Sequence, residues 1–518
     1  MLFAIIFYAC ALAAALAFTA LYYTHMFQLE SYQPAQFCHW LKCMPLQKTA
    51  AGVLPALIAA LVLFGFCRHT AAYLIGGVLM LVCVYVFRPF KAKKPLVFTA
   101  RVLRLLGCYA VLSILLCTVF GVLRLPGLTP VVLIASPLLL LLANAVNRPM
   151  ENAVRNHYIR EAKQIIAARR PNLIVIGITG SYGKTSTKYF LAKLLSQKYN
   201  VLMTPASYNT TMGVVKVIRE MLKPSHEVFI CEMGARRAGE IKEICDIVLP
   251  THGIITSIGP QHLETFGSIE NIISTKFELA DAVGDSGFVL LNGDNRYIYE
   301  RRYSKKYHYY GMENPAVDYF AENVSSSVDG TSFVLHLPQG ASLQLNARLI
   351  GKHNVLNIIA ASAMASMLGV EPRDIVRAVK MLEPVPHRLQ MVDGGDVVII
   401  DDAFNSNPVG AKSALEALSG FDGLRVLVTP GMVELGESQN ILNRDFGAHA
   451  AEVCNYIYIV GKVNYNSIYE GAASTGFDVG TRVIGVDTPE QAIAAVRALN
   501  TDRRKYVLLE NDLPDNFR

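Results

Sequence analysis

The sequence is short of charge and has no paired cysteines. Charged side chains make up only 17% of the 518 residues, against 52% hydrophobic ones, and this balance excludes a wholly soluble protein. Seven of the ten cysteines precede residue 150, and Cys231, Cys245 and Cys454 are scattered singly, so neither a disulfide framework nor a zinc site is predicted. The sequence also lacks internal repeats and low-complexity tracts.

Long apolar segments are concentrated before residue 150, and each is about long enough to cross a bilayer as a helix. Only Arg68 and His69 separate the second segment from the third, which indicates a helical hairpin. The first segment has neither the basic start nor the small-residue cleavage site of a signal peptide, so we expect it to be retained. We therefore predict a multi-span transmembrane domain over residues 1–150, with about five helices near 3–22, 51–67, 70–87, 106–123 and 129–146.

The basic residues between these segments predict the orientation of the chain. The loop between the third and fourth segments carries far more Lys and Arg than the turns at Arg68 and Arg124, which places that loop in the cytoplasm. Five crossings then put the amino terminus outside and all residues after 150 inside. The loop is either a solvated segment or a contact with anionic lipid head groups. Its residues are Arg88, Lys91, Lys93, Lys94, Arg101 and Arg104, and they supply much of the net charge of +7, which therefore does not indicate nucleic-acid binding.

After residue 151, short β-rich runs alternate with amphipathic stretches, which predicts an α/β fold with mainly parallel sheets. We expect a first α/β domain over 151–385, with a polar helix at 151–170, a hairpin-rich patch at 307–350 and a helix at 353–368. A Pro-containing segment at 384–388 separates it from a second, smaller α/β domain over 386–518. The expected strands are 173–179, 228–233, 253–258 and 287–292 in the first domain, and 397–402, 425–429, 456–460, 483–486 and 506–510 in the second.

A glycine-rich turn at Gly177–Ser186 follows the first of these strands and precedes a helical segment. Its pattern is GxxGxxGKT, with the first glycine one position earlier than in the strict Walker spacing. Such a turn points backbone N–H groups and the positive end of the helix dipole at one spot, which binds phosphate. Lys184 adds a charge for the outer phosphates, and the Thr185 hydroxyl is a ligand for their magnesium ion.

Three further side chains fall near strand ends or on a helix of the same domain, where open parallel sheets build their sites. Glu232 ends the strand after Val228, His262 follows the next strand, and Lys276 lies in a helical stretch. Taken alone, each has an ordinary explanation: Glu232 as a surface carboxylate or helix cap, His262 as a polar loop residue, and Lys276 as part of a solvated face.

The joint order of these motifs resembles the Mur ligase family, over about residues 170–518. The branch it resembles most adds D-alanyl-D-alanine to the peptidoglycan precursor. The resemblance therefore implies a Mur-ligase-type central domain with a P-loop and a Rossmann-like C-terminal domain. The motifs are, in chain order, Gly177–Ser186, Asn209–Gly213, Glu232–Ala235, His262–Gly267, Lys276, Gly351–Asn357 and Asp402–Pro408.

The resemblance also implies roles for individual residues. Lys184 and the amides of the loop hold the ATP phosphates, Thr185 and Glu232 bind one Mg²⁺, His262 binds a second, and Lys276 matches the family's carbamylated lysine. The remaining implied positions are Gly180, Ser181, Gly183 and Ser186 of the nucleotide loop, Asn354 and Asn357 on the adenine side, Arg388 and Asp402 over the nucleotide, and Asn209, Thr210, Asn405 and Asn407 near the substrates. The loop Gly431–Gly436 either shapes the pocket for the incoming amine or is a plain turn.

The chemistry implied is an ADP-forming acid–amino-acid ligation in the bacterial cell membrane. ATP converts a carboxylate to an acyl phosphate, and the amine of an amino acid or dipeptide displaces phosphate. The membrane segments stand where the family has a domain that grips the UDP-sugar, and Phe404 and Ser406 replace the Tyr and Ala of that branch. The acceptor is thus UDP-linked or lipid-linked. A polymer-forming ligase of the poly-γ-glutamate type is the alternative enzyme. A third alternative is a transport or scaffold protein with a nucleotide switch, but such a protein would not need a second metal site.

Overall fold

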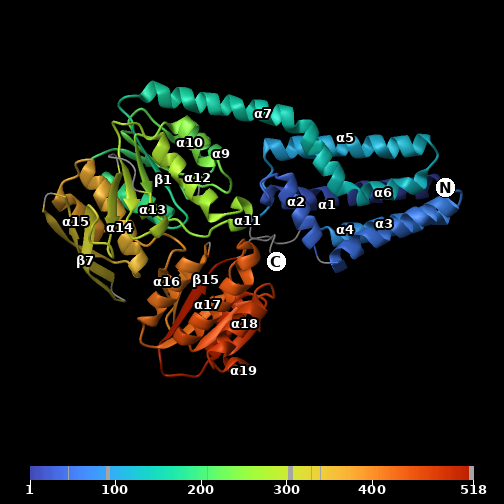
Figure 1. Ribbon diagram of the computed structural model, residues 1–518. Coiled ribbons are helices and arrows are strands. Elements are labelled where there is room, and N and C mark those ends of the chain that lie inside the picture. The colour runs from blue at the N-terminus through green and yellow to red at the C-terminus, as the bar shows by residue number, and fades with distance from the viewer. Residues whose placement is uncertain are drawn as a thin grey trace. The chain divides into compact units, whose positions relative to one another are not determined.

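The structure is a computed structural model that describes residues 1–44, 46–88, 94–206, 208–301, 307–327, 330–338, 340–404 and 406–512. The chain divides into two compact units, with the boundary between Asn156 and His157. The first unit is helical and the second contains two β-sheets (Figure 1).

The helical unit contains the apolar segments expected from the sequence. Three of its helices, α1, α3 and α5, are long and apolar enough to cross a membrane. A fourth crossing is made if η1 and α6 form one broken span with α7, to which they are bent by 72°, and α4 is a shorter apolar helix. The number of crossings therefore stays a prediction. The helices are α1 (Leu2–Leu29), α2 (Pro34–Cys43), α3 (Leu46–Phe66), α4 (Thr70–Val86), α5 (Ala100–Val122), η1 (Pro126–Leu128), α6 (Thr129–Ile134) and α7 (Ser136–Arg169).

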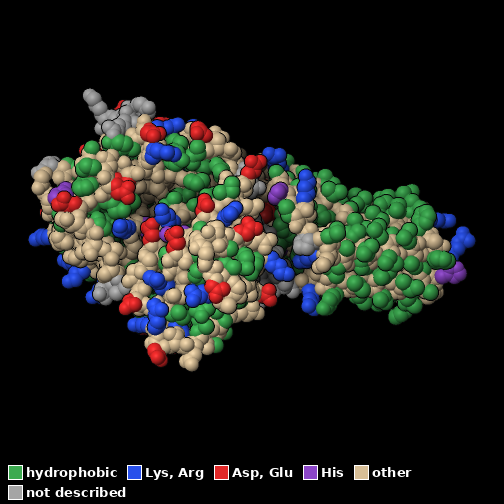
Figure 2. Space-filling view, turned by 60° about the horizontal axis from the view of Figure 1, so that its bottom comes forward, with side chains coloured by type: hydrophobic (Ala, Val, Ile, Leu, Met, Phe, Trp, Pro, Cys, Tyr) green, Lys and Arg blue, Asp and Glu red, His purple; other side chains and the backbone are tan. Residues whose placement is uncertain are grey.

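The surface of this unit is apolar as well. Figure 2 shows hydrophobic side chains over nearly all of its visible face, with Lys, Arg and His toward its ends. Of the basic residues expected in the loop, Lys91 and Lys93 lie outside the described residues, whereas Arg101 and Arg104 lie in the first turns of α5, because that helix begins at Ala100. The guanidinium of Arg104 pairs there with Glu151 at 2.6 Å. The polar helix expected from residue 151 continues the second half of the last apolar segment, since α7 runs unbroken from Ser136 to Arg169.

The middle lobe of the second unit is built on a nine-stranded sheet in the order β2-β3-β1-β4-β5-β6-β7-β8-β9. Neighbouring strands from β2 to β7 pair in parallel, and β7, β8 and β9 form the antiparallel patch expected between 307 and 350. The strands are β1 (Ile174–Thr179), β2 (Val201–Met203), β3 (Val228–Glu232), β4 (His252–Ile255), β5 (Val289–Asn292), β6 (Tyr307–Gly311), β7 (Tyr319–Ser327), β8 (Gly330–His336) and β9 (Ser342–Ala347).

Helices cover both faces of this sheet, because side chains that alternate along each strand are buried on both sides. Ile176 and Ile178 belong to the core beneath α8 and α14, and Val175 belongs to the core beneath α9, α10 and α12. The helices are α8 (Lys184–Leu195), α9 (Thr211–Met221), α10 (Glu240–Val248), α11 (Leu263–Phe266), α12 (Ile269–Ala282), α13 (Arg296–Tyr299), α14 (Lys352–Met367) and α15 (Pro372–Lys380).

The C-terminal lobe has a six-stranded sheet in the order β10-β11-β15-β12-β13-β14, parallel except for the edge strand β10. The predicted α/β fold class is confirmed by these two sheets. The strands are β10 (Gln390–Asp393), β11 (Val397–Asp402), β12 (Leu424–Thr429), β13 (Tyr456–Val460), β14 (Val483–Val486) and β15 (Lys505–Glu510). The helices are α16 (Pro408–Ser419), η2 (Gly436–Ser438), α17 (Gln439–Val453), α18 (Tyr465–Ser474), α19 (Val479–Arg482) and α20 (Pro489–Ala498).

Candidate functional site

Three adjacent parallel strands bring the predicted site residues to one edge of the middle sheet. The order β3-β1-β4 places the carboxyl ends of these strands side by side. Glu232 is the last residue of β3, the glycine-rich loop leaves β1, and His262 lies beyond β4. The carboxyl edge of a parallel sheet is where ligands bind in open α/β folds.

The glycine-rich loop has the backbone of a phosphate cradle. Gly180 (φ +147°) and Gly183 (φ +81°) adopt conformations that L side chains rarely take, and Gly183 leads directly into α8. Ser181 fixes the loop to the next strand, because its N–H donates to the Ser257 carbonyl at 2.6 Å and its hydroxyl to the Gly259 carbonyl at 3.0 Å. The free N–H groups at the start of α8 are therefore positioned for an anion.

Lys184 folds back over this loop. Its ammonium donates to the carbonyls of Gly180, at 2.7 Å, and Ser181, at 3.1 Å. Burial, opposed by Glu232 and reinforced by the guanidinium of Arg388, lowers the pKa of Lys184 to about 8. A bound phosphate would stabilise the charged form of this buried ammonium.

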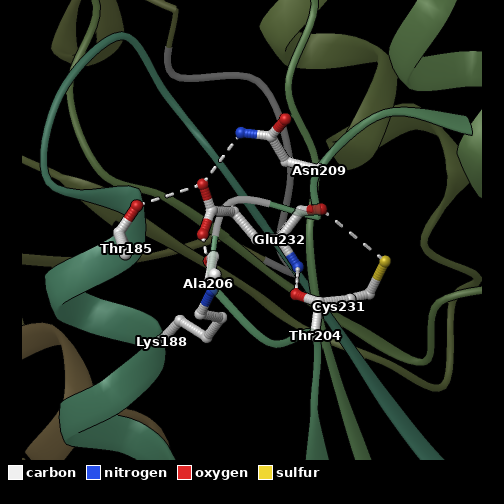
Figure 3. Close-up of polar contacts among 7 residues, drawn as sticks. All are labelled: Thr185, Lys188, Thr204, Ala206, Asn209, Cys231 and Glu232. Carbon is white, nitrogen blue, oxygen red and sulfur yellow. Dashed lines mark hydrogen bonds and ion pairs between the residues drawn. The ribbon is translucent and has the colours of Figure 1, made fainter. Parts of the chain in front are cut away.

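Glu232 is the centre of the polar contacts drawn in Figure 3. Its Oε1 accepts from the Thr185 hydroxyl at 3.2 Å and from the Asn209 amide at 3.1 Å, and its Oε2 pairs with the Lys188 ammonium at 2.8 Å. The side chains of Lys188 and Glu232 are 0% and 1% exposed. Burial alone would raise the pKa of Glu232, but Lys188 and Lys184 hold it below its usual value, so the group is a carboxylate.

His262 is held by the C-terminal lobe. Its Nδ1 lies 2.5 Å from Oε2 of Glu434, whose Oε1 lies 3.5 Å from the guanidinium of Arg236. His262 has a positive φ of 52° at the start of α11. Burial lowers the pKa of His262 despite Glu434, so the ring is neutral near pH 7 and Nε2 is available as a ligand.

Lys276 is buried in α12 rather than solvated. Its side chain is 2% exposed, and its ammonium lies 5.9 Å from the centre of the Phe266 ring. Burial, reinforced by the charge of Lys184 and opposed by Glu240 and Glu278, lowers the pKa of Lys276 to about 7. An amine with this pKa has a substantial neutral fraction near pH 7, and the neutral amine is the form that reacts with carbon dioxide.

The C-terminal lobe also contributes Arg388 and Asp402. The Asp402 carboxylate accepts from the Leu389 N–H at 3.2 Å, and the Arg388 guanidinium lies 4.5 Å from the centre of the Phe404 ring. Burial raises the pKa of Asp402 to about 6, although Arg388 opposes that rise. Since Arg388 acts on both Lys184 and Glu232, its charge belongs to the phosphate region.

The other predicted residues divide into those that support the loop and those that cap helices. The Asn357 amide oxygen accepts from the Thr187 hydroxyl at 3.2 Å and would be 2.5 Å from a Cβ at Gly183, whereas the Asn354 amide donates to the Ile350 carbonyl. Asn405 lies outside the described residues. Ser186 is buried in α8, Thr210 caps α9 through the Gly213 N–H, and Asn407 caps α16 through the Gly410 N–H.

Two residues of the site were not predicted, Lys188 and Glu434. Lys188 lies one helical turn after Lys184, and this spacing is the signal that could have placed both ammonium groups on the same face of α8. Glu434 lies in the loop Gly431–Gly436, but its contact with His262 spans 172 positions and two lobes, which local sequence does not reveal.

The donor set fits magnesium shared with a nucleotide. No group of three or more His, Cys, Asp or Glu side chains that could hold a metal occurs in the part of the chain that the structure describes. Mg²⁺ keeps several waters and binds through one or two carboxylates plus substrate phosphates, so a single carboxylate beside a phosphate loop suffices. Glu232 and Thr185 are such a pair.

Comparison with known proteins identifies both lobes. A family model described as the Mur ligase middle domain matches residues 178–365, and one described as Mur ligase, glutamate ligase domain, matches residues 387–509. The UDP-N-acetylmuramoyl-tripeptide--D-alanyl-D-alanine ligase of Mycobacterium leprae is 31% identical over 359 residues, which cover 63% of this chain and 68% of that protein. The enzyme of that name from Bacillus subtilis is 32% identical over 279 residues, covering 53% and 59%.

Solved structures give the same result. MurF from Acinetobacter baumannii superposes with a TM-score of 0.63 at 28% identity, covering 69% of this chain and 77% of that one. The MurF ligase from Thermotoga maritima in complex with ADP superposes with a TM-score of 0.60 at 25% identity, covering 69% and 80%. The chain spans about 60% of the length of the first curated relatives it matches.

Proposed function

The chain belongs to the Mur ligase family, and we propose that it is a MurF-like, ADP-forming ligase that joins a peptidoglycan-precursor carboxylate to the amine of D-alanyl-D-alanine or a similar amino compound. The observation that carries the proposal is the phosphate loop beside the buried carboxylate Glu232, with Lys276 buried near Lys184. Burying a carboxylate and two ammonium groups costs free energy, so their presence together favours a catalytic role over a purely structural one.

The loop and α8 bind ATP in this proposal. Lys184 and the N–H groups at the start of α8 hold the phosphates, and Asn357 supports the loop at Gly183. Thr185 and Glu232 would hold one magnesium ion, and His262 would hold a second. When bound, these ions would neutralise negative charge on the phosphates. The T. maritima MurF solved with ADP, which superposes on this chain, supports the nucleotide assignment.

The reaction needs positioning and electrostatics rather than a protein nucleophile. An acceptor carboxylate oxygen attacks the γ-phosphorus, the bond to ADP breaks, and an acyl phosphate forms. The amine then attacks the acyl carbon, a proton is lost, and inorganic phosphate leaves with that carboxylate oxygen. In this proposal Arg388 and Glu434 of the C-terminal lobe lie near the reacting groups, where they would help to exclude water from the acyl phosphate.

Lys276 is proposed to be carbamylated, as the family resemblance implies. The neutral amine attacks carbon dioxide and loses a proton, which gives an anionic carbamate. The charge of Lys184, which disfavours a second ammonium at this position, would favour that anion.

We further propose that the ligase lobes lie in the cytoplasm and that the helices hold the enzyme in the cell membrane. The apolar helices α1, α3 and α5 support this placement. Because these helices precede the matched region, which begins at residue 178, a lipid-linked acceptor is the second candidate beside the UDP-linked tripeptide. A polymer-forming ligase would instead yield a ladder of products.

The test uses the full-length protein in detergent with ATP and Mg²⁺. We expect phosphate release and one amide product only when an acceptor and an amine are both present, with UDP-MurNAc-tripeptide and D-Ala-D-Ala as the first pair. Lys184→Ala should abolish turnover, whereas Lys193→Ala, on an exposed position of the same helix, should not. Turnover by the Lys184→Ala protein would contradict the proposed role of Lys184 in phosphate binding. If turnover requires a lipid-linked acceptor, that acceptor replaces the UDP-linked one in the proposal.

A further inference from the structure

We propose that a groove between α1 and α5 binds a membrane lipid with an anionic head group, the hydrocarbon chain lying along the two helices and the head group at Arg124. The proposal rests on the membrane placement above but not on the ligase reaction. The groove has a volume of about 930 Å³, near the upper end of ligand sites, and its walls are almost wholly apolar.

Two stripes of side chains define the groove. On each helix the lining residues follow a spacing of three and one, which keeps them on a single face. They extend over about 24 Å of α1 and about 23 Å of α5 at 1.5 Å per residue, against a hydrocarbon core of about 30 Å. The groove is therefore long and narrow, as an acyl chain requires. The stripes run from Ile5 to Leu21 on α1 and from Leu106 to Gly121 on α5.

Small side chains make the space, and tyrosines hold the helices at its edges. Ala9, Ala13 and Ala17 of α1 face the groove, as do Ala110 and Gly121 of α5. The Tyr8 hydroxyl is hydrogen-bonded to Thr129 at 2.6 Å, and the Tyr109 hydroxyl to Ser136 at 2.7 Å. Each of the two helices is thus tied to a segment after α5, which keeps the groove open between them.

One wall residue carries a hydroxyl. Ser113 is 3% exposed and lines the groove close to the Tyr109 hydroxyl. An ester or hydroxyl oxygen of a lipid lying in the groove would find a hydrogen-bond donor in this otherwise apolar wall.

Arg124 gives the groove a charged end. It is the only charged residue that lines the cavity, it follows α5 directly with a φ of +57°, and no ion pair to it is found in the described parts of the chain. A guanidinium at the edge of a bilayer binds lipid phosphate strongly and in a bidentate manner. The chain then returns through α6 and α7 toward the ligase lobes, so the head group lies in the leaflet opposite the proposed cytoplasmic one.

The experiment uses the full-length protein in phosphatidylcholine vesicles that contain a small fraction of phosphatidylglycerol with a photoreactive group in its acyl chain. We expect cross-links on the groove stripes of α1 and α5. Ala110→Phe, which fills the groove, should lower this labelling at least fivefold. The matched control is Val111→Phe on the same helix, which is 65% exposed and outside the groove, and it should leave labelling unchanged.

Arg124→Gln tests the head group separately. It should reduce groove labelling by photoreactive phosphatidylglycerol several-fold and leave labelling by the corresponding phosphatidylcholine unchanged. Equal groove labelling in the Ala110→Phe and Val111→Phe proteins, or loss of both lipids' labels in Arg124→Gln, would overturn the proposal. Labels confined to exposed residues such as Leu115 would overturn the lipid site and leave the membrane placement intact, whereas absence of label from every helix would overturn both.

Discussion

At the scale of single residues, the site depends on a buried ion pair that supports Glu232, the proposed metal ligand. Lys188 donates to Glu232 at 2.8 Å and to the Ala206 carbonyl at 2.6 Å, so its ammonium is satisfied without water. The pair therefore keeps Glu232 ionised and leaves its other oxygen facing Thr185. Removing one partner of such a pair leaves an uncompensated charge in the interior.

Lys188→Met should lower the free energy of unfolding of the ligase lobes by about 3–5 kcal/mol, because Glu232 loses its closest cation. Unfolding in urea, monitored by far-UV circular dichroism, measures the change. Lys193→Met on the exposed face of α8 is the control and should change stability by less than about 0.5 kcal/mol. A loss of under 1 kcal/mol in Lys188→Met would show that the pair contributes little.

Glu510 predicts a pH dependence of stability. This residue ends β15 and is 1% exposed, its carboxyl accepts from the hydroxyls of Ser406 and Thr429, and burial raises its pKa from 4.5 to about 7. Between these two values the folded chain binds one proton more than the unfolded chain, so the free energy of unfolding falls as the pH rises.

The expected loss from this group between pH 4.5 and pH 7.5 is about 3 kcal/mol, at 1.36 kcal/mol for each pKa unit. Glu510→Gln should remove that slope, because an amide does not titrate. Thermal unfolding of the two proteins at a series of pH values measures the difference. Parallel pH profiles for the wild type and Glu510→Gln would mean that Glu510 titrates alike in the folded and unfolded chains.

At the scale of elements, the sequence predicted the long, buried strands and the loop between β1 and α8, because their apolar runs and glycines are local signals. It did not predict the short edge strands β2 and β10, whose few residues form a strand only beside a neighbour. Lys184, Thr185 and Glu232 were found at one edge as expected, whereas the cross-lobe contact of Glu434 depends on tertiary structure.

Gly183→Ala should abolish nucleotide binding. Gly183 has a φ of +81°, and an added Cβ would lie 2.5 Å from Oδ1 of Asn357, so the loop must shift away from α14. Gly239 is a matched control, because it also begins a helix with a positive φ, of +86°, but has open space at its Cβ position. Calorimetric titration with ADP and Mg²⁺ should show at least a hundredfold weaker binding for Gly183→Ala and near-normal binding for Gly239→Ala. Equal affinities would contradict the cradle.

At the scale of the whole molecule, the chain joins an apolar helical unit to a two-lobed Mur ligase. The lobes meet at the nucleotide edge through Glu434, His262 and Arg236, which are separated by up to 198 positions in sequence. The composition predicted the long apolar helices and the α/β fold, but it contains no signal for how far the two lobes close on one another. The sequence also does not predict the identity of the acceptor, because the region that matches the family begins only at residue 178.

The central claim is that the two lobes convert a carboxylate to an acyl phosphate, and the fate of the carboxylate oxygen tests it directly. An acceptor labelled with ¹⁸O at both carboxylate oxygens is turned over with ATP, Mg²⁺ and the amine, and the released phosphate is analysed by mass spectrometry. Our account predicts one ¹⁸O in each phosphate, because the oxygen that attacks the γ-phosphorus leaves with it. Phosphate without ¹⁸O, formed together with the amide product, would contradict it.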